Sequence, residues 1–195
     1  RSGFSRNLYE KCMRVIKKNL DYQNIKKADT VIANSKFSKR LFERTYRKKA
    51  LVIQLGIDTN FFKPNSKIHK TIDILFIGSK EKLDGYDTFI KIKDKLIKKL
   101  SYRELLFENE WISSKNEMRK IYQKAKIVLC LARSEPLGLV PLEAMATGAI
   151  PIAVDEGGHS ETIIDKETGF LLPRNHEKIA SCIIKVLSSQ KLRKK

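Results

Sequence analysis

Short apolar runs alternate with longer amphipathic segments along most of this chain. Residues 72–77, 127–131 and 149–154 are nearly continuous apolar stretches of strand length, and the segments between them carry apolar residues at helical spacing. Such strands are typical of a sheet that is covered on both faces. When single helices link them, the connections are right-handed crossovers and the sheet is parallel. The sequence therefore predicts a doubly wound α/β fold with a Rossmann-like parallel sheet.

The formal net charge of +18 favours anionic partners. The positive residues are spread along the whole chain, and no RNA-recognition, zinc-finger or basic-zipper signature accompanies them, so we do not expect nucleic acid as a partner. A peripheral contact with an anionic membrane surface remains open. No apolar run approaches the roughly 20 residues that span a bilayer.

The cysteines indicate a reducing compartment. Cys12, Cys130 and Cys182 are far apart, odd in number and outside any C-x-x-C pattern. We predict a cytoplasmic protein, with any membrane contact at the inner face. Because the chain opens Arg1-Ser2-Gly3-Phe4, without an initiator methionine or a signal peptide, we expect it to be part of a longer protein.

Ligands of open parallel sheets bind outside the carboxyl ends of the strands, which directs attention to the loops after residues 77, 131 and 154. The loop after residue 131 carries Glu135, and Glu143 follows on the helix that begins just beyond. Gly138 lets the chain approach a ligand closely, and free N–H groups at the helix start can bind phosphate. Spacing alone favours a simpler interpretation, in which both acids are exposed side chains placed favourably against the helix dipole.

The amino-acid sequence of this region resembles that of the retaining, nucleotide-sugar-dependent glycosyltransferases that are built from two facing Rossmann domains (GT-B, group 1). The mark of that family is two glutamates separated by seven residues, as in Glu135 and Glu143. The resemblance continues through residues 150–158, 161–163 and 168–172, and upstream through 28–35 and 55–64, so it covers nearly the whole chain. It implies a GT-B C-terminal domain with a remnant of the preceding domain. Residues 1–62 would be the end of the N-terminal acceptor domain with the linker, and 63–195 the donor-binding domain.

The resemblance implies roles for individual residues. Glu135 would be the catalytic residue and would accept hydrogen bonds from the donor sugar, while Glu143 would bind the ribose hydroxyls. The nucleobase would rest near Trp111 and Ile112, although Trp111 could also be an ordinary core aromatic. The remaining residues expected at the donor site are Gly78, Ser79, Lys80, Lys82, Leu137, Gly138, Leu139, Gly157 and Gly158.

One departure from the family pattern concerns the diphosphate. The family places an Arg after the first strand's glycine and a Lys five residues later, whereas this chain has Ser79 and Asp84. Lys80 and Lys82 lie in the same loop and could replace those cations, or they could be surface lysines. Loss of both cations would remove the main electrostatic stabilisation of the departing nucleotide.

These features give two functional hypotheses. The first is a fragment of a hexosyltransferase that moves a sugar from a nucleoside-diphosphate sugar to a glycan or lipid-linked acceptor with retention, as in polysaccharide biosynthesis. The second is a non-catalytic nucleotide-sugar-binding module that has lost its diphosphate-binding cations. Neither hypothesis includes a cofactor or a metal, because His69, His159 and His176 are scattered without a carboxylate at ligand spacing. For His159 we leave two roles open, a phosphate contact and helix capping.

Overall fold

The computed structural model describes residues 2–97, 105–108 and 114–189, and the chain divides into two compact units after Gln54. Within these described ranges, no helix combines the length and the apolar character that crossing a membrane requires.

The first unit contains two helices and two short parallel strands within its described residues. Ile32 pairs with Leu51 and Ala33 with Val52, and the Ser35 hydroxyl accepts the Ser38 N–H at 2.9 Å at the start of the second helix. The elements are α1 (Ser2–Lys27), β1 (Ile32–Ala33), α2 (Lys36–Tyr46) and β2 (Leu51–Val52). The assignment of this unit to an acceptor domain stays a prediction.

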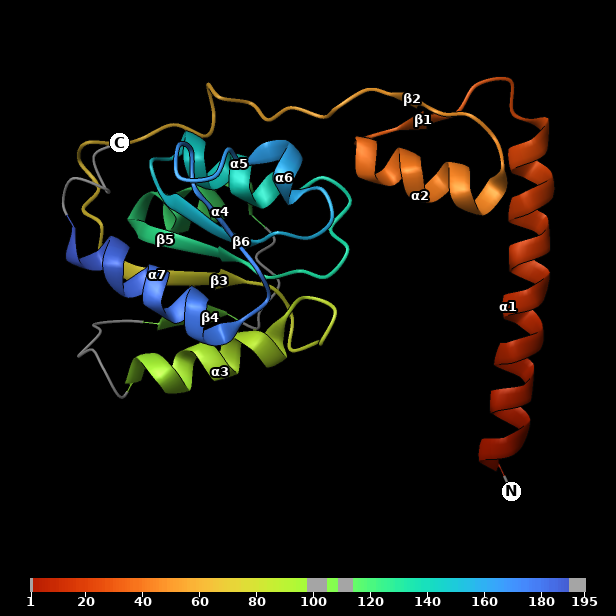
Figure 1. The fold of residues 1–195 in the computed structure, drawn as a ribbon, viewed down its shortest axis with the longest axis horizontal. Coiled ribbons are helices and arrows are strands. Elements are labelled where there is room, and N and C mark those ends of the chain that lie inside the picture. The colour runs from red at the N-terminus through yellow and green to blue at the C-terminus, as the bar shows by residue number, and fades with distance from the viewer. Residues whose placement is uncertain (1, 98–104, 109–113, 190–195) are drawn as a thin grey trace. The chain divides into compact units, whose positions relative to one another are not determined.

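The second unit is built on a parallel sheet, which confirms the predicted fold class. Over the described residues the sheet has five strands in the order β4-β3-β5-β6-β7, all paired in parallel (Figure 1). The strands are β3 (Ile72–Ile77), β4 (Leu105–Glu108), β5 (Ala125–Cys130), β6 (Ile150–Val154) and β7 (Phe170–Leu172). Strand β4 lies on one side of β3, whereas β5, β6 and β7 follow on its other side, so the strand order reverses between β3 and β5. Folds of this kind bind ligands at such a switch point.

Helices cover both faces of this sheet (Figure 1). One core lies between the sheet and the pair α3 and α7, and includes Phe89, Ile92 and Ile183. The other core lies on the side of α4, α5 and α6, and includes Tyr122 and Ala144. The helices are α3 (Tyr86–Ile97), α4 (Lys115–Lys124), α5 (Leu139–Ala146), α6 (His159–Thr162) and α7 (His176–Ser188).

Residues 55–62, which we had grouped with the preceding domain, lie in the second unit. The buried Phe62 ring packs edge-on against Tyr122, with 6.2 Å between ring centroids. The Asp58 carboxylate accepts the N–H groups of Asn60 and Phe61 at 2.9 and 3.1 Å and so fixes the turn that leads into Phe62. Aromatic burial therefore anchors this polar, turn-rich segment to the core on the side of α4, α5 and α6.

Two helices of the second unit begin in different ways. The Asn175 side chain accepts the N–H groups of Glu177 and Lys178 and so caps α7. Ser114 occupies the N-cap position of α4, but its side chain makes no capping hydrogen bond.

Candidate functional site

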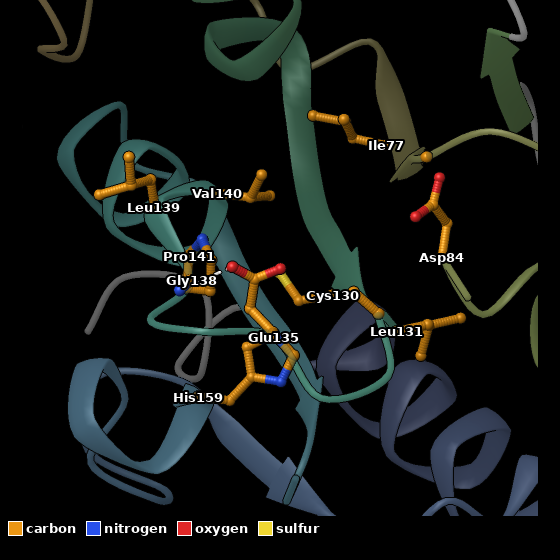
Figure 2. A pocket seen from close by; sticks show the side chains of 12 residues that line it. Ile77, Asp84, Cys130, Leu131, Glu135, Gly138, Leu139, Val140, Pro141 and His159 are labelled. Carbon is orange, nitrogen blue, oxygen red and sulfur yellow. Dashed lines mark hydrogen bonds between the residues drawn. The ribbon is translucent and has the colours of Figure 1, made fainter. Parts of the chain in front are cut away.

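A hollow of about 270 Å³ opens at the switch point, where the loops after β3 and β5 meet. Figure 2 shows the side chains around it. Its lining includes Gly78 and Asp84 from the loop after β3, Glu135 and Gly138 from the loop after β5, and His159 from α6. The rule that ligands bind at the carboxyl edge of the sheet thus locates a real depression in this chain.

The Glu135 carboxylate lies over the start of α5. Its Oε1 accepts the Gly138 N–H at 3.2 Å, and Figure 2 shows the carboxylate directed toward Gly138 and Pro141. Gly138 is the N-cap residue of α5 with a φ of 89°, a left-handed conformation that suits glycine, and no side chain caps the helix. The N–H groups of Leu139 and Val140 at the start of α5 therefore have no helical acceptor, and both residues line the hollow.

Cys130 forms part of the same wall, and in Figure 2 its sulfur lies beside the Glu135 carboxylate. Burial and the negative charge of Glu135 hold the pKa of the Cys130 thiol above its ordinary value. At neutral pH this side chain is therefore an uncharged thiol and not a nucleophilic thiolate.

The buried His159 closes the hollow from α6. Its Nδ1 lies 3.0 Å from the Val154 carbonyl oxygen, which can only accept, so Nδ1 carries the proton of this bond. Burial lowers the pKa of His159 below its ordinary value, although the Val154 carbonyl and Glu135 act in the opposite direction. The neutral ring then has an unprotonated Nε2, which can accept a hydrogen bond.

The loop after β3 brings no cation into the hollow. Among the described residues that line it there is no Lys or Arg, and Asp84 adds a second carboxylate. Asp84 Oδ2 accepts both the backbone N–H and the hydroxyl of Ser79, at 2.7 and 2.6 Å. The two positions at which the family pattern has Arg and Lys are thus bonded to each other.

The two candidate replacement cations lie elsewhere. Lys80 and Lys82 are exposed. Desolvation acts to raise the pKa of Asp87, but the charge of Arg133 and, to a smaller extent, that of Lys82 contribute to a net lowering. The Lys82 carbonyl accepts the Arg133 Nε–H at 3.0 Å, and Arg133 Nη2 binds Asp87 Oδ2 at 2.8 Å. The structure therefore associates Lys82 with the Arg133–Asp87 pair.

Glu143 lines a second hollow, of about 450 Å³, on the other side of the start of α5. Its Oε2 accepts the Tyr122 hydroxyl proton at 2.7 Å. Burial raises the pKa of Glu143, while the Tyr122 hydrogen bond and the charge of Lys115 act against that rise. Lys115, Phe61 and Leu139 also line this hollow, and Leu139 lines the first hollow as well. The two glutamates therefore occupy adjoining depressions that meet at the first residue of α5.

Gly157, Gly158 and Leu137, which are also predicted site residues, contribute to the packing of the loop that carries Glu135. Gly157 and Gly158 lie against the backbone of the Glu135 loop, where an added β-carbon would approach the carbonyl oxygens of Glu135 and Pro136 to 2.5 Å. The Gly158 N–H also donates to the Glu135 carbonyl at 2.7 Å. Neither glycine lines either of the two hollows, and Leu137, which also does not line them, is buried. These residues shape the loop that carries Glu135.

Trp111 and Ile112, the expected nucleobase contacts, lie outside the described residues. Ser114 and Lys115, which follow them, line the second hollow. We therefore keep the nucleobase assignment as a prediction.

Three residues that support the site were missed by the sequence analysis. Tyr122 is buried in the core and donates its hydroxyl proton to Glu143. Arg174 forms two bonds to Glu156, at 2.9 and 2.6 Å, and donates to the carbonyls of Leu131 and Ala132, so it ties the end of β7 to the end of β5. Gly85 lies against the Leu131 carbonyl. The position of Arg174 just after the last strand was a usable signal, because that end of the sheet carries the site.

Taken by itself, a parallel sheet with acidic groups and open helix amides at its switch point defines a Rossmann-like ligand-binding domain. Comparison with known proteins narrows this class. The family model "Glycosyl transferases group 1" matches residues 93–195, and the chain belongs to that family.

Individual proteins agree with this assignment. An uncharacterized glycosyltransferase of Methanocaldococcus jannaschii is 28% identical over 186 residues, which is 86% of this chain and 52% of that protein. The chain thus spans about half the length of this relative. The crystal structure of the C-terminal domain of a group 1 glycosyl transferase, LpcC from Francisella tularensis, matches with a TM-score of 0.57 at 27% identity, over 71% of this chain and 91% of that one. The structure of HepE from Anabaena with UDP and glucose matches with a TM-score of 0.68 at 18% identity, over 85% of this chain and 55% of that one, and supports the fold alone.

Proposed function

We propose that this chain is the donor-binding part of a retaining glycosyltransferase and that a nucleoside-diphosphate sugar binds across the start of α5. The observation that carries the proposal is the pair of hollows that meet at Leu139, with one family glutamate in each. A ligand with a sugar at one end and a ribose at the other has the polarity that this arrangement requires, because both ends present hydroxyl donors to carboxylate acceptors.

In this proposal each part of the donor has a partner. The sugar lies in the first hollow and donates hydroxyl protons to Glu135, whose Gly138 contact already holds the carboxylate in place. The distal phosphate lies at the first amides of α5, including that of Leu139, where the helix dipole favours negative charge. The ribose donates to Glu143 in the second hollow. The intact parent protein would transfer the sugar to a glycan or lipid-linked acceptor with retention of configuration.

The missing cations decide how well this site can catalyse. Two carboxylates and no Lys or Arg line the described part of the first hollow. The amides of α5 would be the main stabilisation for the negative charge that develops on the leaving diphosphate, and preorganised donors of this kind matter most in a water-excluded site. We expect the isolated chain to bind nucleotide weakly and to be inactive.

Calorimetric titration with UDP and GDP tests the binding. UDP is the first choice because HepE, which shares the fold, was crystallised with it. Glu143→Ala should abolish the binding heat, whereas Glu167→Ala, which removes the same charge from an exposed turn beyond α6, should leave it unchanged. An unchanged heat for Glu143→Ala would reject the assigned pocket.

The second candidate, a non-catalytic nucleotide-sugar-binding module, is favoured by one observation. Ser79 and Asp84 form two hydrogen bonds with each other at the positions of the family's cations. If this candidate is right, the parent protein is inactive as it stands, and the double variant Ser79→Arg/Asp84→Lys gains transfer activity. Measurable activity of the unaltered parent would reject it.

A further inference from the structure

Glu143 is a half-buried carboxylate that binds a buried tyrosine through one of its oxygens. Oε2 accepts the Tyr122 hydroxyl proton at 2.7 Å, a length typical of a charge-assisted O–H···O bond. Glu143 also lines the second hollow. A carboxylate offers about four acceptor positions, so one bond from Tyr122 leaves the remaining ones for a ligand.

Tyr122 has no freedom to place its hydroxyl elsewhere. The ring is fully buried, belongs to the core between the sheet and α4, α5 and α6, and packs edge-on against Phe62. Its neighbours fix the ring, and the ring fixes the hydroxyl oxygen next to α5. The bond also joins two helices through side chains that are 21 residues apart.

The surroundings of the Glu143 carboxyl determine its charge. The titratable and charged groups that face it are Tyr122 and Lys115 of α4, Asp58 of the segment before β3 and, next to Tyr122, the Cys130 thiol of β5. His159 of α6 faces Glu135 beyond the start of α5. Burial favours the protonated acid, and the Tyr122 hydroxyl and the Lys115 charge favour the carboxylate. Burial and the neighbouring carboxylate hold the pKa of Tyr122 far above its ordinary value, so Tyr122 remains the donor at all accessible pH.

We propose that Tyr122 is a positioning residue, which holds the Glu143 side chain with one oxygen bonded to the core and the other presented to the hydroxyl groups of a ligand in the second hollow. Tyr122 itself does not touch the ligand. This inference rests on the proposed function, because it takes the ribose of a nucleotide as the ligand. It adds a residue outside the paired-glutamate segment to the set that determines recognition of ribonucleotides.

The variant Tyr122→Phe removes the hydroxyl and keeps the ring that fills the core. Without its donor, the buried carboxylate loses both its fixed orientation and part of the stabilisation of its charged form. Tyr86→Phe is the matched control, because Tyr86 packs beside Phe89 on the opposite face of the sheet.

The first measurement uses UDP, GDP and their 2′-deoxy forms as probes, with calorimetry or NMR titration of the whole chain. If Tyr122 positions Glu143, the wild-type chain prefers the ribonucleotide, and Tyr122→Phe reduces that preference by roughly threefold to tenfold. A purely structural role would weaken both forms equally and leave the preference unchanged, which would overturn the inference alone. If neither UDP nor GDP binds the wild-type chain, the proposed function and this inference both fail.

The second measurement needs no ligand. NMR titration of the Glu143 side-chain carboxyl carbon should give a higher pKa in Tyr122→Phe than in the wild-type chain and in Tyr86→Phe. Equal values in all three would show that the hydroxyl does not stabilise the carboxylate and would overturn the inference, even if nucleotide affinity had changed.

Discussion

Among the glycines of the second unit, Gly85, which lies against the end of β5, should be the one at which an added side chain destabilises the fold most. A β-carbon added at Gly85 would lie 2.1 Å from the Leu131 carbonyl oxygen, and the φ of this residue is +87°. The left-handed conformation costs an alanine about 1–2 kcal/mol. Relief of the overlap requires the two loops to separate, which costs about 1–3 kcal/mol more. We expect Gly85→Ala to lower the free energy of unfolding by about 2–5 kcal/mol.

Two other glycines provide matched controls that separate these terms. Gly148 has a φ of +77°, and its added β-carbon would meet Pro64 at an ordinary 3.8 Å, so Gly148→Ala measures the conformational term alone, about 1–2 kcal/mol. A β-carbon added at Gly56 would meet no atom within 4 Å beyond the adjacent residues, and Gly56→Ala should change the stability by no more than about 0.5 kcal/mol.

Urea denaturation followed by far-UV circular dichroism gives the three values, provided that the slope with denaturant is unchanged among the variants. The expected order of destabilisation is Gly85, then Gly148, then Gly56. Because the Leu131 carbonyl lies at the edge of the first hollow, Gly85→Ala should also weaken UDP binding, whereas Gly148→Ala, at the far end of α5, should not. Equal destabilisation by the Gly85 and Gly148 variants would refute the reasoning from the contact.

Three further predictions follow from charged groups. Asp84→Asn keeps an acceptor for Ser79 but removes a negative charge from the hollow, and it should strengthen UDP binding about fivefold by calorimetry; weaker binding would count against a phosphate nearby. Arg174 lowers the pKa of Glu156, so their bond stabilises the fold at neutral pH and is lost as the pH falls below the ordinary value of 4.5; Arg174→Met should lower the melting temperature most at neutral pH, and a pH-independent loss would contradict this. Burial lowers the pKa of Lys70 to about 8, so Lys70→Met should stabilise the protein by about 1 kcal/mol at neutral pH, and this gain should shrink as the pH rises from 8 toward 10.5 in thermal melts.

The fold was predictable because its signals are local. Each strand of the second unit is a short apolar run, and glycine or a polar loop ends most of them, as Gly78 does after β3. The position of Phe62 was not predictable, because the neighbouring polar residues indicate a turn and only long-range packing against Tyr122 draws the ring into the core.

The candidate site divides in the same way. The loop carrying Glu135 and the start of α5 could be located from the sequence in two ways. Ligands of parallel sheets bind at the carboxyl ends of the strands, and this segment resembles the sequence pattern of the family. The Tyr122–Glu143 bond could not, because it depends on how α4 and α5 lie against the same face of the sheet. Nor does the sequence between Ser79 and Asp84 reveal that the two side chains bond to each other, since both residue types are ordinary in an exposed loop.

The meeting of the two hollows at Leu139 has a consequence for small synthetic ligands. A compound that fills one hollow engages only one of the paired glutamates and should bind weakly. Joining two such compounds by a linker that passes over Leu139 makes the second contact intramolecular, and a fitted linker raises overall affinity by orders of magnitude without new contacts. Fragment screening followed by chemical linkage is therefore a suitable route to synthetic ligands of this domain.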